Sequence, residues 1–209
     1  ALKTNNILTC VAKIPSTANS IKFDAISFPH SSQDTETITC AETTVWAIME
    51  YFGNKYPEYK PTLPSKIINT LRNVTNERQL PSHGLQVQQM SYTLKEFGFG
   101  TKIYSRDEYK TEFDQLLSCY VESGIPLIIA LDNNAYRDSP GADSSIRYVG
   151  HAMLCTGHVN IEDYMIDTLS PLNSTYSYIN NILSKKNIEI FEWDGIRKQF
   201  VFIDDNHAI

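Results

Sequence analysis

Hydrophobic positions in the first half of the chain recur at helical spacing. From Cys40 to Gly53 the apolar positions that lie three or four residues apart are Val45, Ile48, Met49 and Phe52. This spacing predicts an amphipathic helix that begins near Cys40 and has Gly53 just after its last turn. Thr37 or Thr39 could cap the helix, which leaves Cys40 in its first turn.

The same spacing predicts three further helices before residue 125. They cover Leu63 to Leu71, Gly84 to Phe97, and Phe113 to Val121. Gly98 and Gly124 follow the last two, as is usual after a helix end. Short strands are expected at Ile7 to Ile14, Ile21 to Phe28 and Thr101 to Tyr104.

The second half of the chain is dominated by short apolar runs of the kind that form strands. The expected strands are Ile125–Leu131, Tyr148–Cys155, Tyr164–Asp167, Ile188–Phe191 and Phe200–Ile203. Helices followed by antiparallel strands are typical of an α+β fold. No linker divides the chain, so a single domain over 1–209 is expected.

Composition narrows the classes of partner and compartment. The 209 residues carry a net charge of −6, which argues against nucleic acid or an anionic membrane as partner. No apolar run is long enough for a transmembrane segment. A secreted protein that lost a signal before Ala1 and a cytoplasmic protein both fit, as does a longer protein that continues beyond Ile209. The oligomeric state is open.

The cysteines and histidines do not form a motif for a metal site or a disulfide framework. The chain has 4 Cys and 5 His, with no CxxC pair and no metal-ligand spacing. Cys10, Cys119 and Cys155 each lie in an apolar run and are expected to be buried core residues. Neither a metal nor another cofactor is predicted.

Cys40 differs from the other cysteines because it begins a helix. The positive end of the helix dipole favours a thiolate there. His151 begins an apolar strand far downstream and could activate the thiol if the fold brings the two together. Gln33, in the loop before the helix, could donate a hydrogen bond to a developing oxyanion. This combination predicts a cysteine hydrolase.

Three aspartates could orient the histidine. Asp204 and Asp205 follow the strand Phe200–Ile203, and Asp167 ends a shorter strand. If Asp204 is the partner, residues 160–198 form an insertion in the hairpin. If Asp167 is the partner, the later residues form a C-terminal extension. The later pair is favoured, although an aspartate at a strand end is often just a turn residue.

These residues resemble the papain-like cysteine peptidases, and within them the C39-like group related to the bacteriocin-leader peptidases. The matching pieces, in chain order, are Gln33, the Cys40 helix, Gly84–Val87, Phe97–Phe99, Gly124–Ile128, Gly150–Met153 and Phe202–Asn206. The resemblance implies a papain-like fold with a helical N-terminal half packed on an antiparallel sheet. It also implies Cys40 as nucleophile, His151 as general base and acid, Gln33 as oxyanion donor and Asp204 as orienter.

The chain departs from that family's pattern at the nucleophile. Thr39 and Ala41 flank Cys40 where the family has Asp and Gly, and Glu42 adds a negative charge close to the thiol. Residues 160–198 have no counterpart in compact members. The expected activity is hydrolysis of a peptide or isopeptide bond in a peptide or protein substrate. Alternatives are an acyl or γ-glutamyl transferase and a catalytically silent papain-like binding module.

Overall fold

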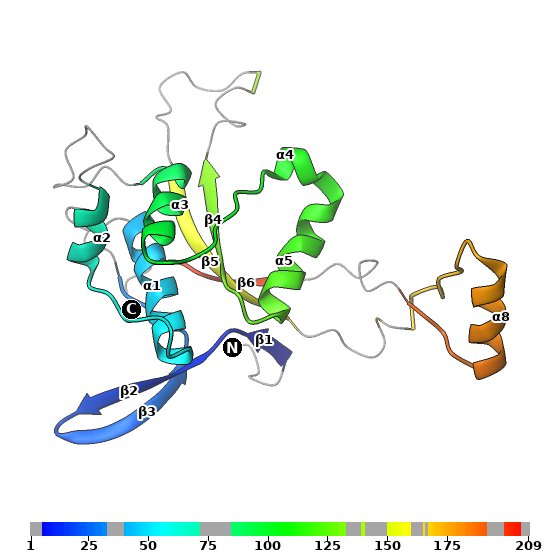
Figure 1. Cartoon of the computed structure of the whole chain (residues 1–209), viewed down its shortest axis with the longest axis horizontal. Coiled ribbons are helices and arrows are strands. Elements are labelled where there is room, and N and C mark those ends of the chain that lie inside the picture. Colours follow the sequence, from blue (N-terminus) through cyan, green and yellow to red (C-terminus); the bar gives the residue numbers. More distant parts are fainter. Residues whose placement is uncertain are drawn as a thin grey trace.

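A computed structural model describes residues 6–32, 40–71, 85–132, 139–140, 150–159, 165, 167–191 and 199–205. These residues form helices and antiparallel sheets, as the α+β prediction requires (Figure 1). The elements are β1 (Ile7–Thr9), β2 (Ala12–Ala18), β3 (Ile21–Ser27), α1 (Cys40–Lys55), α2 (Pro64–Leu71), α3 (Val87–Glu96), α4 (Arg106–Tyr109), η2 (Lys110–Glu112), α5 (Phe113–Glu122), β4 (Leu127–Asp132), β5 (Gly150–Val159), α8 (Ser177–Lys186) and β6 (Phe200–Ile203).

Strand β5 is the centre of the main sheet. It pairs antiparallel with β4 along its first half, with β1 along its last residues, and with β6. Both β1 and β6 pair with His158, so they lie on opposite edges of β5. Strands β2 and β3 form a separate hairpin that extends away from the sheet (Figure 1).

Gly157 allows β1 to approach β5 closely. A Cβ atom at this position would collide with the carbonyl oxygen of Leu8 and would lie 2.7 Å from Cα of Thr9. The neighbouring ladder between β5 and β6 shifts register between Cys155 and Gly157. Glycine in a strand often marks such a close backbone approach or bulge.

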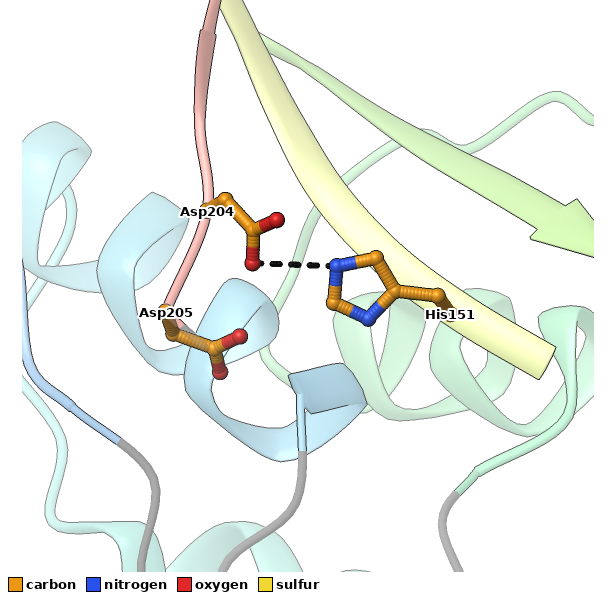
Figure 2. Close-up of side chains that lie close together, drawn as sticks. All are labelled: His151, Asp204 and Asp205. Carbon is orange, nitrogen blue, oxygen red and sulfur yellow. Dashed lines mark hydrogen bonds and ion pairs between the residues drawn. The ribbon is translucent and has the colours of Figure 1, made fainter. Parts of the chain in front are cut away.

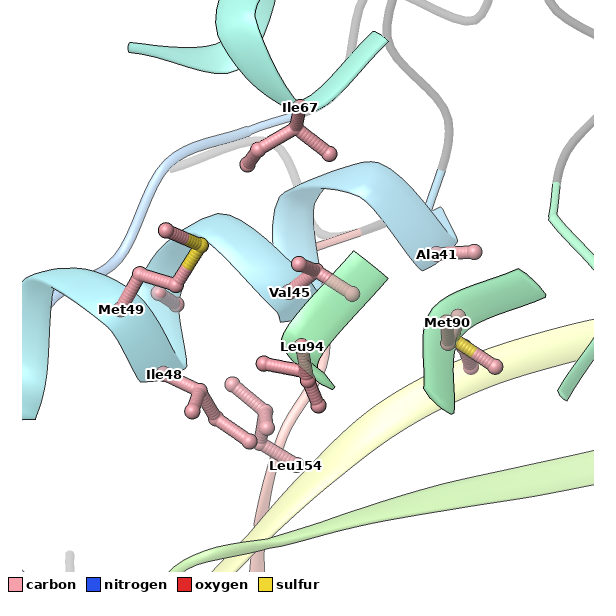
Figure 3. Packing of buried hydrophobic residues seen from close by; sticks show 10 residues of the cluster. Ala41, Val45, Ile48, Met49, Ile67, Met90, Leu94 and Leu154 are labelled. Carbon is pink, nitrogen blue, oxygen red and sulfur yellow. The ribbon is translucent and has the colours of Figure 1, made fainter. Parts of the chain in front are cut away.

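The hydrophobic core joins α1, α2 and α3 to one face of β5 (Figure 3). Val45 and Ile67, from α1 and α2, are completely buried there, and Leu154 of β5 is 2% exposed. The helical spacing of the apolar residues in α1 produces this buried face. The core therefore fixes α1, which carries Cys40, against β5, which carries His151.

Gly53 has a different role from the predicted one. It lies inside α1, which continues to Lys55, and does not follow the helix end. A Cβ at Gly53 would lie 2.7 Å from the backbone nitrogen of Pro61, so glycine allows the loop before α2 to pass close to α1. By contrast, Gly98 and Gly124 follow α3 and α5 with positive φ angles of 89° and 77°, as predicted.

Several predictions for short elements are wrong. Residues 101–104 and 188–191 are not strands, Met165 is helical, and Asp167 lies in a turn. The polar segment from Ser170 to Lys186 contains α8, which the sequence analysis missed. Residues 72–84, which include the predicted start of the third helix, lie outside the described part of the chain, and α3 begins at Val87.

The chain leaves the sheet after β5 and returns to it at β6. The backbone N–H of Val159 donates to the carbonyl of Gln199 across 2.8 Å, so the two ends of this excursion are adjacent. Helix α8 lies within it and stands apart from the sheet (Figure 1). No helix in the described residues combines the length and apolar character needed to cross a bilayer.

Candidate active site

His151 and Asp204 are hydrogen-bonded to one another. Nε2 of His151 lies 3.0 Å from Oδ1 of Asp204 (Figure 2). Their side chains are 19% and 28% exposed, so the pair is partly shielded but still accessible. An ionised carboxylate at this distance accepts a hydrogen bond from the tautomer that carries its proton on Nε2, and this bond fixes the orientation of the ring.

The strand register explains why residues so far apart in sequence meet. Ile203, the last residue of β6, pairs with Leu154 of β5. Because the strands are antiparallel, the chain beyond Ile203 runs toward the N-terminal end of β5, where His151 lies. Asp204 and Asp205 therefore lie next to His151.

Asp205 is a nearly fully buried carboxylate of the site. It is 6% exposed, and within the described structure neither carboxylate oxygen has a hydrogen bond of normal geometry. Burial raises the pKa of Asp205, and the charge of Asp204 raises it further. The Thr43 hydroxyl, its own backbone N–H and His151 act in the opposite direction and lower that pKa.

Cys40 begins α1 and lies against β5 beside His151. The backbone of Ala152, the residue that follows His151, lies close enough to the thiol to lower its pKa. The second ring nitrogen of His151, Nδ1, points toward this N-terminal end of α1 in Figure 2. Helix α1 and strand β5 thus bring the thiol close to Ala152 and Asp205, the chain neighbours of His151 and Asp204.

The pKa of Cys40 is raised, contrary to the thiolate expected from the helix dipole. Burial is the main cause, and the negative charges of Asp205 and Glu42 add to it. Backbone hydrogen bonds from Ala152 and Ala41 lower the pKa but do not outweigh burial. Desolvation disfavours the charged form of a thiol, and nearby carboxylates do the same.

The other predicted site residues have different outcomes. Asp167 is exposed in a turn, whereas Asp204 and Asp205 lie beside His151. Gln33 and the possible caps Thr37 and Thr39 lie outside the described residues, so the oxyanion role of Gln33 stays a prediction. Thr43 was missed by the sequence analysis. Its position three residues after Cys40, on the same helix face, was the available signal.

The remaining cysteines and His158 lie outside this site. Cys10 and Cys155 are buried as predicted, but Cys119 is exposed on α5, so the prediction that it belongs to the core is wrong. Helix α5 buries one face and exposes the other, and Cys119 lies on the exposed face. His158 bonds instead to Glu122 of α5, with Nε2 and Oε1 3.0 Å apart.

A large apolar groove reaches the same end of the sheet. Its volume is about 1070 Å³, and it runs between α3, α5 and β4. Residues along it include Met90, Tyr120 and Ile128, and it extends to Leu131 and Asp132. These last two pair with His151 and Gly150 across the ladder, so the groove ends beside the histidine strand.

Comparison with known protein families, with curated proteins and with solved structures found no match to this chain. The resemblance to papain-like peptidases therefore rests on the residues and motifs of the chain itself.

Proposed function

We propose that the chain is a papain-like cysteine peptidase of the C39-like type. The observation that carries the proposal is the position of His151, whose Nε2 bonds to Asp204 while Nδ1 faces the helix end that bears Cys40. A thiol, an imidazole and an orienting carboxylate in this order are the groups that acyl transfer by cysteine needs.

In the proposed reaction His151 begins as a neutral base. Nδ1 takes the proton of the Cys40 thiol as the sulfur attacks the substrate carbonyl carbon. The tetrahedral oxyanion collapses to a thioester, and the leaving amine takes the proton from Nδ1. Water, deprotonated by the same nitrogen, then attacks the thioester carbon; the C–S bond breaks, the acid product leaves, and the proton passes from Nδ1 to the Cys40 sulfur. Gln33 and the backbone N–H of Cys40 are the proposed oxyanion donors.

The raised pKa of Cys40 selects between two modes of activation. A preformed thiolate–imidazolium pair requires a depressed thiol pKa, whereas burial, Asp205 and Glu42 raise it here. The resting site is therefore proposed to be neutral, with proton transfer accompanying attack. The groove beside β4 offers apolar subsites for the side chains of a peptide.

The test compares variants on a diverse peptide library, with cleavage read by mass spectrometry. Cys40→Ala should abolish cleavage, and His151→Ala should reduce it about 10²- to 10⁴-fold, the usual contribution of a general base. Cys119→Ala is the matched control, because it removes an exposed thiol outside the site and should retain activity. Full activity in Cys40→Ala would rule the proposal out.

One observation favours a catalytically silent module instead. A partly buried thiol with a raised pKa is a poor nucleophile unless the histidine assists it. Peptide probes with an electrophilic carbonyl distinguish the two. A peptidase labels at Cys40 and loses that labelling in His151→Ala, whereas a silent module labels equally slowly in both.

A further inference from the structure

Neither carboxylate oxygen of Asp205 has a hydrogen bond of normal geometry among the residues that the structure describes, although the Thr43 hydroxyl lies near enough to lower the pKa of this carboxyl. The side chain of Asp205 is 6% exposed, and both oxygens are shielded from solvent. An unsatisfied buried carboxylate is costly, so such a group in a folded protein points to a missing partner. The small cavity on one side, lined by His30 and Thr43 among others, measures about 10 Å³. That is at the lower limit for one water molecule.

Asp205 is directed toward two other potential ligands. The His151 ring nitrogen and one oxygen each from Asp204 and Asp205 all lie within 4.8 Å of one another. Figure 2 shows the three side chains converging from β5 and from the end of β6. Ligand atoms around a tetrahedral zinc ion are about 3.4 Å apart for metal–ligand bonds near 2.1 Å. The His151–Asp204 separation of 3.0 Å is close to this value, and the separations to Asp205, all within 4.8 Å, would adjust by side-chain rotation when an ion binds.

We propose that His151, Asp204 and Asp205 bind one divalent cation of the zinc type, and that the bound ion switches off the Cys40 thiol. One imidazole nitrogen with two carboxylate oxygens suits zinc and leaves a coordination position open, whereas magnesium and calcium prefer oxygen alone. Two carboxylates also match the charge of the ion. The spacing of histidines predicts no such site, because the fold joins ligands 53 residues apart.

The switch follows from the nitrogen that the ion would occupy. A metal ion binds a ring nitrogen that carries no proton. Binding at Nε2 displaces the proton that Asp204 accepts and leaves the ring proton on Nδ1. An Nδ1–H cannot take the thiol proton, so attack by Cys40 stops. This second half of the inference rests on the proposed function, but metal binding itself does not.

Zinc binding is measured directly, by calorimetry with zinc alone as the probe. The Cys40→Ala and Cys40→Ser proteins are used so that the nucleophile cannot hold the ion. We expect one ion per chain in both proteins. When Asp205→Asn is added, the zinc affinity should fall by a factor of about ten or more. Asp24→Asn is the matched control, since Asp24 lies in the β2–β3 hairpin, 2.8 Å from Lys13 and away from the site. Circular dichroism checks that each variant is folded.

Two results would overturn the metal site. One is the absence of zinc binding in both folded Cys40 variants. The other is binding that Asp205→Asn weakens no more than Asp24→Asn does. If zinc binds as expected but no substrate is cleaved by the wild-type chain, the proposed function fails and the metal site stands.

The inhibitory half is tested with Cys40 present. Zinc should lower the cleavage rate of the wild-type chain, and a chelator should restore it. The same zinc concentration should reduce the rate of Asp205→Asn by a smaller fraction, taken relative to that variant's own rate without zinc. Equal fractional inhibition of the two proteins would show that zinc acts elsewhere, for example on the thiol alone, and would overturn the switch.

Discussion

At the scale of single residues, Asp205 affects the ionisation of the candidate site. Its charge raises the pKa of Cys40, and burial raises its own pKa. Asp204 has the same side chain one position earlier, but it is more exposed and is bonded to His151. Two adjacent aspartates therefore have different environments although their carboxylates lie close together.

Cys40 is predicted to react slowly with iodoacetamide at neutral pH and faster as the pH rises. The thiolate is the reactive form, and below its pKa the thiolate fraction falls about tenfold per pH unit. Asp205→Asn removes a charge that raises the pKa of Cys40, so its rate profile should move to lower pH. Mass spectrometry of a Cys119→Ala background, with a chelator present, gives the rate at Cys40.

Asp24→Asn in the same background separates this local effect from a change in net charge, since Asp24 is paired with Lys13. An unchanged or higher-pH profile in Asp205→Asn would contradict the assigned electrostatics.

At the scale of elements, α1 is held in place partly by a close contact that only glycine permits. Gly53→Ala would gain about 1 kcal/mol of helix propensity. The new Cβ would lie 2.7 Å from the nitrogen of Pro61, and overpacking of this kind costs about 1–3 kcal/mol. We expect a net loss in the free energy of unfolding, measured by urea denaturation. Gly100→Ala, which meets no atom within 4 Å, is the control. Stabilisation by Gly53→Ala would contradict the contact.

Helix α5 is tied to β5 by His158. Its Nδ1 lies 2.9 Å from the carbonyl of Val159, and its Nε2 bonds to Glu122. His158→Leu should therefore lower the free energy of unfolding by about 1–3 kcal/mol, because buried hydrogen bonds are lost. His30→Leu changes an exposed loop residue and should alter it by less than about 0.5 kcal/mol. If the two substitutions changed the free energy of unfolding equally, the hydrogen bond of His158 to Glu122 would not stabilise the fold.

The elements that could be predicted are those with a long apolar pattern. The helices at Cys40 and Phe113 and the strands at Leu127 and Phe200 have clear periodicity, and all are present. Ile188–Phe191 is apolar but pairs with no strand among the described residues. Helix α8 carries Ile179, Ile182 and Leu183 at helical spacing, but this short pattern lies in a mostly polar segment and none of it is buried. Short elements depend on tertiary neighbours, which the local sequence does not encode.

At the scale of the whole molecule, α8 is an addition that the core does not need. None of its residues is buried, and the chain on either side is joined by a hydrogen bond of 2.7 Å from the N–H of Leu172 to the carbonyl of Ile190. Replacing residues 173–189 by an Asn-Gly turn should therefore change the free energy of unfolding by less than about 1 kcal/mol. Urea denaturation measures this, and the far-ultraviolet circular dichroism should lose the signal of one helix.

A second deletion, of a strand in the main sheet, is the control for the α8 deletion, because it shows whether the chain tolerates the loss of any element. Removing β6, residues 200–203, takes a strand from the main sheet and should unfold the chain. Unfolding of the α8 deletion as well would mean that α8 contributes contacts to the core.

The candidate site could be predicted only in part. Cys40 and His151 stand out because a thiol begins a helix and a histidine begins an apolar strand. The choice among Asp204, Asp205 and Asp167 could not be made, because it depends on the pairing of β5 with β6. Burial of Cys40 also has no local signal, so the direction of its pKa shift was missed.

Because β6 must pair with β5 to complete the site, the site is completed last during synthesis. The ribosome delivers the thiol on α1 first, then the imidazole on β5, and the carboxylates only after residues 160–199 have been made. Pairing across so long a separation is slow compared with helix formation. A nascent chain therefore holds Cys40 and His151 without Asp204 and Asp205, and the hydrogen bond that orients the ring cannot form until β6 has joined the sheet.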